Sequence, residues 1–294
     1  MTDVLDVPVA GGSLRVQSWP GAGPPVLAVH GITSSSMSWP LLAQELDQPL
    51  FAPDLRGRGR SNRLPGPYGM GVHADDCAAV IRAVCDEPVV VVGHSMGAFV
   101  AAVLAARAPE LVRAVVLVDG GLPFPAVDEQ AVLAGLEPIK QRLLASYTRE
   151  EYRNWFRHHP AFASDWTPEV EAYADYDLPD DPGRPSADPD VVEADQVDMV
   201  VGTTFAEAAE QQPRPRAFLH APRGFADDPP GLYPQATVDG FAERWPDLDV
   251  RRVDDVNHYT IVLSRRGASA VAGAVRDLSA GTTSEEPPHD RRNR

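Results

Sequence analysis

The stretch PVVVVGHSMGAFVAAVLAAR, residues 88–107, decides the fold of this 294-residue chain. Residues 88–93 contain four consecutive valines without polar alternation, which is typical of a parallel strand covered on both faces. Residues 97–107 are rich in alanine and predict a helix. A strand that passes directly into a helix in this way is typical of α/β folds with a parallel sheet.

Short apolar runs and amphipathic segments alternate on both sides of this stretch. We expect buried strands at residues 25–29, 50–53, 114–118, 217–220 and 248–253. We expect helices at residues 38–46, 75–84 and 261–278. An early hairpin is expected at the sheet edge, with strands at residues 4–9 and 13–18. The alternation predicts the α/β fold class, with a mainly parallel sheet flanked by helices.

The alternation is interrupted between residues 120 and 215. This segment is acidic, is expected to be helical and contains many aromatic residues. Its proline- and aspartate-rich stretch, residues 178–190, is expected to be an exposed loop. We therefore predict a helical cap at residues 120–215, inserted between a first core part, 1–119, and a second core part, 216–278. Residues 279–294 are polar and predict a disordered tail.

Charge and composition argue against several classes of protein. The chain has 26 Lys and Arg against 42 Asp and Glu, a net charge of −16, so the phosphates of a nucleic acid would be repelled over most of the surface. Lys140, the single lysine, lies in no glycine-rich context, which argues against a P-loop. Cys77 and Cys85 lie eight residues apart in one expected helix and are expected to be reduced.

The sequence also predicts the localisation of the protein and the kind of partner it binds. Its first residues lack a basic region followed by an apolar run, and no apolar stretch reaches about 18 residues, so we expect neither a signal peptide nor a membrane span. We expect a cytoplasmic protein that acts on a small molecule and binds neither nucleic acid nor membrane. A homodimer is compatible with the sequence.

The turn between the expected strand and helix carries the first chemical signal. Gly93-His94-Ser95-Met96-Gly97 fits the pattern G-x-S-x-G, whose glycines relieve crowding around a strained serine turn. The helix that begins there directs its N-terminal amides toward developing negative charge. The pattern alone occurs by chance, but its strand–turn–helix context is specific. Ser95 is therefore the candidate nucleophile.

Three further motifs, two before this turn and one after it, complete a pattern that resembles the α/β-hydrolase family over about residues 4–278. His30-Gly31-Ile32 resembles the H-G-x segment after the third strand of that family, and DLRGRGRS (residues 54–61) resembles its D-x-R-G-x-G-x-S loop. Asn257-His258-Tyr259 resembles its late histidine loop. The resemblance implies an α/β-hydrolase fold with an inserted helical cap.

The resemblance also implies roles for particular residues. The backbone N–H groups of Ile32 and Met96 would form an oxyanion hole, where fixed donors stabilise a tetrahedral oxyanion. We expect His30 to be a hydrogen-bonded structural residue. We expect the loop at residues 54–61 to be scaffold, anchored by Asp54.

The base and the acid are assigned from position in the chain. His258 follows the last expected strand and precedes a helix, the position from which an imidazole reaches a serine at the turn. At the usual family position of the acid the sequence has Gly224, and Asp227 lies three residues later. Asp119 ends the strand 114–118, a position at which some branches of the family carry the acid. We choose Asp119 over Asp227.

These residues predict a serine hydrolase that forms an acyl-enzyme on Ser95 and cleaves a carboxylic ester or lactone of a small, apolar or aromatic substrate. Trp39 and Trp155 are the candidate substrate contacts. No metal or other cofactor is implied. The alternatives are a C–C bond hydrolase, thioesterase or perhydrolase with the same triad, or a small-molecule receptor of the same fold. A C–C hydrolase is expected to place an arginine near a substrate carboxylate, and the sequence identifies none.

Overall fold

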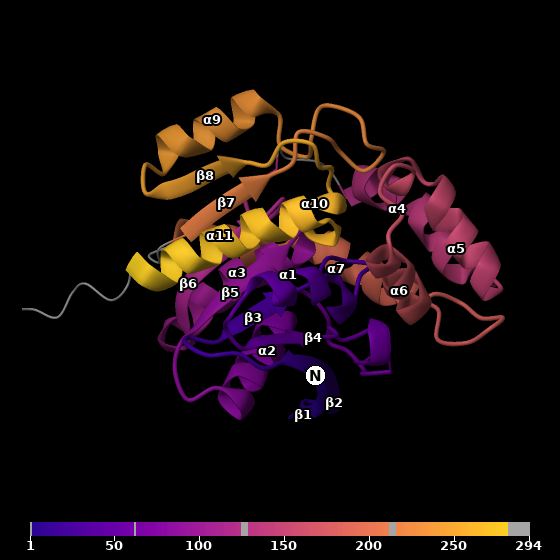
Figure 1. Ribbon diagram of the computed structural model, residues 1–294, viewed down its shortest axis with the longest axis horizontal. Coiled ribbons are helices and arrows are strands. Elements are labelled where there is room, and N and C mark those ends of the chain that lie inside the picture. Colours follow the sequence, from indigo (N-terminus) through magenta and orange to yellow (C-terminus); the bar gives the residue numbers. More distant parts are fainter. Residues whose placement is uncertain (1, 62, 125–128, 212–215, 282–294) are drawn as a thin grey trace, which may run out of the picture.

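The computed structural model describes residues 2–61, 63–124, 129–211 and 216–281, and Figure 1 shows the arrangement of their elements. The described strands form one eight-stranded sheet in the order β1-β2-β4-β3-β5-β6-β7-β8. The strands are β1 (Asp3–Val9), β2 (Gly12–Trp19), β3 (Val26–Val29), β4 (Leu50–Pro53), β5 (Val89–His94), β6 (Val112–Val118), β7 (Arg216–His220) and β8 (Leu248–Arg252). β1 and β2 pair antiparallel, β2 and β4 pair antiparallel, and the remaining neighbours are parallel. The predicted fold class and edge hairpin are confirmed.

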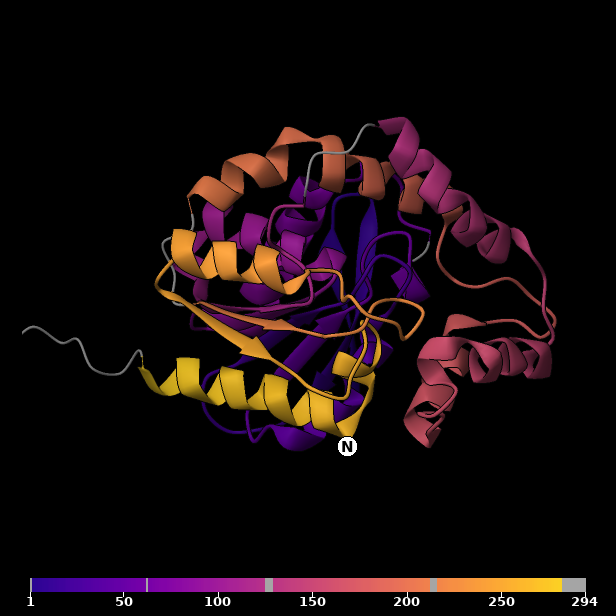
Figure 2. The ribbon, with the colours of Figure 1, turned by 90° about the horizontal axis from the view of Figure 1, so that it is seen from above.

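Helices cover both faces of the sheet, and β5 contributes buried side chains to the core on each face. Val89 and Val91 belong to a cluster with α2 (Met70–Val84) and α3 (Met96–Arg107). Val90 and Val92 belong to a second cluster with residues of the opposite helices. Those opposite helices are α1 (Pro40–Glu45), α10 (Thr260–Leu263) and α11 (Arg265–Gly281). Figure 2 shows α11 on the opposite side of the sheet from α9 (Gln235–Arg244).

Four described helices between β6 and β7 form a cap beyond one end of the sheet. They are α4 (Glu129–Leu144), α5 (Arg149–His158), α6 (Pro168–Asp177) and α7 (Pro189–Val201). Figures 1 and 2 both show α4, α5 and α6 grouped to one side of the sheet. The next helix, α8 (Thr203–Glu210), belongs to the core, because Phe205 packs edge-on against Phe99 of α3 with ring centroids 4.5 Å apart. The described cap is therefore shorter than the predicted segment 120–215.

The structure differs from the predicted helices in ways that trace to tertiary contacts. α2 begins at Met70, five residues earlier than predicted, because Asp195 and Asp198 of α7 accept the N–H groups of Gly69 and Met70, both at 2.7 Å. These acids cap the helix from a distant part of the chain. α9 lies where no helix was predicted, and the closing helix is divided into α10 and α11.

Two predicted segments at the surface also differ from the structure. In the stretch 178–190, predicted as an exposed loop, Leu178 and residues 185–187 are buried. Ser186 explains this burial, since its hydroxyl accepts the N–H of Gly59 at 3.1 Å and thereby joins this stretch to the core. α11 continues through Gly281, three residues into the predicted tail, and residues 282–294 lie outside the described residues.

The loop at residues 54–61 is a buried scaffold, as expected. Asp54 anchors it by accepting the N–H groups of Ser36 and Arg60, both at 2.8 Å. Arg56 binds the carboxylate of Asp76 through Nε and Nη2, both at 2.9 Å. Both sides of this ion pair are almost fully buried, so the guanidinium is committed to the fold and is not an anion site.

A second buried arginine ties the cap to this loop. Arg58 pairs with Asp195 of α7, and His73 of α2 contacts the same carboxylate at 2.8 Å. Burial by itself raises the pKa of Asp195, but the charge of Arg58 and the contact with His73 outweigh it and hold the pKa below its ordinary value. The cap is thereby joined to the core through an ionised cluster.

Candidate active site

The turn after β5 holds Ser95 in a conformation that few residues adopt. Its φ of 52° and ψ of −124° lie outside the ordinary regions for an L-residue, and such strain is characteristic of functional sites. Close packing maintains it. A Cβ at Gly93 would lie 2.2 Å from the carbonyl oxygen of Gly97, and a Cβ at Gly97 would lie 2.1 Å from that of Val29. Only glycine fits at both positions, so the chain can turn sharply and present Ser95 at the end of the strand.

Asp119 lies directly beside this turn because β5 and β6 are paired. His94 lies opposite Val118, and a Cβ on Gly120 would meet the carbonyl oxygen of Ser95 at 2.3 Å. The side chain of Asp119 is fully buried, and its Oδ1 accepts the N–H of Ala221 at 3.2 Å. The end of β6 therefore places a fixed carboxylate next to the candidate nucleophile.

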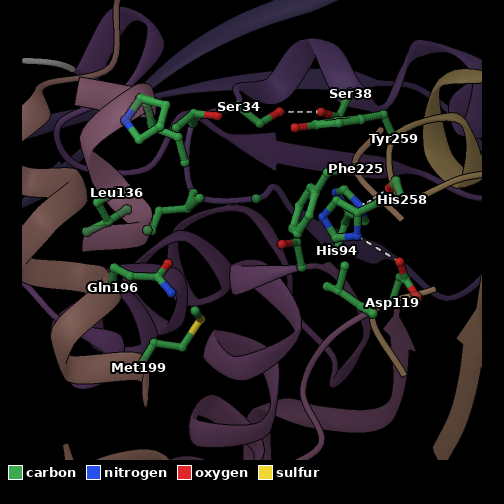
Figure 3. Close-up of a pocket in the computed structure, with 18 of the residues that line it drawn as sticks. Ser34, Ser38, His94, Asp119, Leu136, Gln196, Met199, Phe225, His258 and Tyr259 are labelled. Carbon is green, nitrogen blue, oxygen red and sulfur yellow. Dashed lines mark hydrogen bonds and ion pairs between the residues drawn. The ribbon is translucent and has the colours of Figure 1, made fainter. Parts of the chain in front are cut away.

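His258 contacts this carboxylate. Its Nδ1 lies 2.7 Å from Oδ2 of Asp119, and the dashed line in Figure 3 marks the contact. When Nδ1–H donates to the carboxylate, Nε2 is left as the proton acceptor, which is the tautomer that a general base needs. The imidazole is almost completely buried, so its orientation is fixed by the surrounding chain.

Asp227, the alternative acid, is engaged elsewhere. Its Oδ1 accepts a hydrogen bond from Asn257 Nδ2 at 2.8 Å and lies 2.8 Å from Nε of Arg223. Its carboxylate therefore supports the loop that carries His258 rather than the imidazole itself. The geometry favours Asp119 as the partner of His258.

The segment His30-Gly31-Ile32 lies against the serine. A Cβ on Gly31 would be 3.3 Å from Cβ of Ser95, and Ile32 lines the cavity described below. Arg58 Nε donates to the carbonyl of Ile32 at 2.8 Å, which holds this segment in place. Met96 is the first residue of α3, so its N–H is one of the amides that a helix leaves without an intrahelical acceptor. Its side chain is fully buried away from the cavity.

His30 has the structural role expected for it. Its Nδ1 donates to the carbonyl of Gly31 at 2.8 Å, and its Nε2 accepts the N–H of Leu55 at 2.9 Å. Burial lowers the pKa of His30 to about 4, so the ring is neutral at pH 7. The ring therefore holds the loop after β3 to the loop after β4.

Two residues of the site were not identified from the sequence. His94, the variable residue before Ser95, donates from Nε2 to the carbonyl of His258 at 2.8 Å, and the two ring centroids lie 4.8 Å apart. Burial lowers the pKa of His94, so its ring stays neutral. Phe225 packs edge-on against His258 at 4.4 Å and is half exposed. No local pattern marks either residue, because both contacts join segments far apart in the chain.

These groups line a cavity of about 880 Å³ between the core and the cap. Figure 3 shows Leu136, Gln196 and Met199 of the cap on the opposite side from His94, Asp119 and His258. Most of the described lining is apolar. The cap contributes Ala131, Val132, Gly135, Leu136, Pro138, Ile139, Arg142, Trp155, His159, Tyr173, Gln196, Met199 and Val200.

One of the two predicted substrate contacts lines this cavity. Trp155 is part of the wall, whereas Trp39 is absent from it and has no exposed surface. Trp39 packs in the same core cluster as Leu42 and Leu46, because the three share one face of the segment around α1. The prediction that Trp39 contacts substrate is corrected to a core position.

Comparison with known proteins places the chain in a family. Residues 24–178 match the model of the alpha/beta hydrolase fold family, which is more than half of the chain, and the protein belongs to that family. A solved structure of E-2-(acetamidomethylene)succinate hydrolase superposes with a TM-score of 0.76 at 24% identity and covers 94% of this chain and 100% of the other. At that identity the likeness supports the fold.

Two curated relatives are similar over shorter stretches. The chain is 42% identical to lipase LipV of Mycobacterium tuberculosis over 121 residues, 40% of this chain and 45% of the lipase. It is 41% identical to 2-(acetamidomethylene)succinate hydrolase of Mesorhizobium japonicum over 101 residues, 34% of this chain and 36% of the relative. The chain thus spans less than half the length of either relative.

No group of three or more His, Cys, Asp or Glu side chains among the described residues is arranged to hold a metal ion. None of their helices is both long and apolar enough to cross a bilayer.

Proposed function

We propose that the protein is a serine hydrolase that cleaves a carboxylic ester or lactone of a small molecule through an acyl-enzyme on Ser95. The observation that carries this proposal is the 2.7 Å contact between His258 Nδ1 and Asp119 Oδ2 in a cavity that Ser95 also lines. The names lipase and hydrolase among the relatives support the same class of reaction.

The first half-reaction transfers the acyl group to the protein. Ser95 Oγ attacks the substrate carbonyl carbon while its proton passes to Nε2 of His258. Asp119 stabilises the imidazolium formed in this step. The N–H groups of Ile32 and Met96 receive the oxyanion, and one such donor is typically worth about 3 kcal/mol in the transition state.

The second half-reaction restores the serine. When the tetrahedral intermediate collapses, His258 gives its proton to the leaving alcohol, and the C–O bond to that alcohol breaks. A water molecule then attacks the acyl carbon and loses its proton to Nε2 of His258. The bond to Ser95 Oγ breaks, the proton returns to that oxygen, and the carboxylic acid is released.

An active-site label tests this proposal. A fluorophosphonate should add once to the wild-type protein, as measured by intact mass, and the adduct should disappear in Ser95→Ala. Steady-state turnover of p-nitrophenyl acetate then separates a hydrolase from a receptor, which would show a single slow event. Absence of the adduct in a folded wild-type protein would refute an activated serine.

A further inference from the structure

Arg142 places a positive charge in the wall of an otherwise apolar cavity. It lies on α4 of the cap, its side chain is 13% exposed, and it lines the same cavity as Ser95. Among the described lining residues, Arg142 alone carries a cationic side chain and Asp119 alone an acidic one. Asp119 is fully buried behind His258, so Arg142 supplies the charge that a ligand in this cavity meets.

The guanidinium of Arg142 is only partly paired within the protein. Its Nη1 donates to the hydroxyl of Tyr152 at 2.8 Å and lies 3.9 Å from Oδ2 of Asp177. That carboxylate accepts the hydroxyl of Tyr152 and both the N–H and the hydroxyl of Ser186, so its oxygens are already occupied. Across the described residues, Nε and Nη2 of Arg142 have no hydrogen-bond partner.

An arginine in this position stays charged and favours a bound anion. Burial lowers the pKa of Arg142, but Tyr152 and Asp177 act in the opposite direction, and the pKa lies above its ordinary value. A largely buried charge with unpaired donors is unfavourable, and an anion that accepts those donors relieves this cost.

The unpaired edge matches the geometry of a carboxylate. Nε and Nη2 point in the same direction on a guanidinium and bind two oxygens at once. The protein uses this edge internally, since Arg56 binds Asp76 through the same two nitrogens at 2.9 Å each. In Arg142 the equivalent edge has no acid of the described chain opposite it.

A row of rings connects Arg142 to the catalytic end of the cavity. Its guanidinium lies over Trp155, 4.9 Å from the ring centroid, and Trp155 contacts His159 at 5.0 Å. His159 packs edge-on against Tyr259 at 5.8 Å, and Tyr259 against His258 at 5.4 Å. This row of rings therefore runs from Arg142 to His258 along the described wall of the cavity.

We propose that Arg142 binds a carboxylate of the substrate at the end remote from the bond that is cleaved, so that the substrate is a monoanionic ester with an apolar spacer. This inference rests on the proposed function and names its substrate class. One carboxylate is favoured over several, because the net charge of −16 repels polyanions and the cavity offers one cationic group among its described residues.

The test compares charged and neutral substrates of the same shape. The p-nitrophenyl half-esters of adipic and suberic acids carry the carboxylate on the acyl side, and their monoamides are the neutral matches. On the leaving-group side, 4-carboxyphenyl acetate is compared with 4-carbamoylphenyl acetate. The wild-type protein should prefer the carboxylate on one side by about 10- to 100-fold in kcat/KM, as expected for one charge-assisted contact. Equal kcat/KM within every pair would overturn the inference.

Variants then assign the preference to Arg142. Arg142→Met should abolish the preference mainly through a higher KM for the carboxylate esters, and Arg142→Lys should retain part of it. The matched control is Arg157→Met, since Arg157 also lies over a cap tryptophan, Trp166, at 5.0 Å, but does not line the cavity. A preference that survives in Arg142→Met would contradict the role of this residue.

Failure of this inference and failure of the proposed function are distinguishable. A protein whose Ser95 is labelled and that hydrolyses the neutral esters, without a preference for the carboxylates, retains the proposed function and refutes the inference. If Arg142→Met does not fold, inhibition of the wild-type protein by benzoate against benzamide decides. Stronger inhibition by benzoate that weakens with added salt supports the charged contact, and equal inhibition refutes it.

Discussion

The turn that carries Ser95 and the cap that covers it are held by different kinds of contact. At the turn, backbone meets backbone, and glycines at 93 and 97 leave no room for a Cβ. In the cap, side chains pair across helices, as in the contact between Arg153 of α5 and Asp175 of α6 at 2.8 Å. The cap also contains Gly135, where nothing lies within 4 Å of an added Cβ.

This difference means that the turn holds the reacting groups rigidly, whereas the residues of the cap that contact substrate can vary. A turn fixed by its backbone places the reacting groups without adjustable parts. Partly exposed pairs such as Arg153 with Asp175 contribute little to stability individually, so residues of the cap can change without disturbing that turn. Substrate preference can therefore vary in the cap while the reaction stays the same.

The largest effect is expected from the acid beside the turn. Asp119→Asn should lower kcat for a p-nitrophenyl ester by about 10⁴-fold, since an amide does not stabilise the required tautomer and imidazolium of His258. Asp227→Asn, at the alternative position, should leave kcat within about 10-fold, because its carboxylate contacts Asn257 and Arg223. A greater loss in Asp227→Asn than in Asp119→Asn would reverse the assignment of the acid.

A pair of glycine substitutions tests the contrast in stability. Gly97→Ala should lower the free energy of unfolding by about 3 kcal/mol or more, because the new methyl group would overlap the carbonyl of Val29. Gly135→Ala, inside α4 with open space around it, should be neutral or stabilising by up to about 1 kcal/mol. Urea unfolding followed by circular dichroism measures both. Similar losses at the two positions would show that the turn and the cap are packed alike.

A smaller, pH-dependent effect is expected at His30. Its pKa is lowered from 6.5 to about 4 by burial, so between these values the unfolded chain binds a proton that the folded chain does not. The contribution of the neutral ring is complete above pH 6.5 and is lost as the pH falls toward 4, by about 3 kcal/mol in total.

Urea unfolding at several pH values tests this contribution of His30 to the core. Arg153 lowers the pKa of Asp175, so this cap pair persists at pH values at which His30 already weakens the core. Urea midpoints of wild type and His30→Asn should therefore converge as the pH is lowered from 7 to 4. A difference between the two proteins that is independent of pH would remove His30 as the source.

Much of the fold followed from patterns local to the chain. The valine run at 89–92 and the alanines of α3 predicted a strand and a helix on either side of Ser95, and both are present. The scaffold role of residues 54–61 is likewise confirmed. These predictions succeeded because each depends on residues within one or two elements.

The predictions that failed depended on partners distant in sequence. Trp39 lies three residues before Leu42 and was expected at the substrate, but its helical face turns toward the sheet. The beginning of α2 at Met70 is capped by acids of α7, more than a hundred residues away. Local sequence patterns do not predict such contacts between distant residues.

The sequence by itself determined the parallel sheet, the turn that presents Ser95 and the order of the motifs, because hydrophobic period and glycine spacing act over a few residues. The sequence already favoured Asp119 over Asp227, and the tertiary structure decided how Asp119 contacts His258, that α8 belongs to the core and that Arg142 faces the cavity. Each of these depends on which surfaces meet when the sheet and its cap pack together, and that meeting is a property of the whole chain.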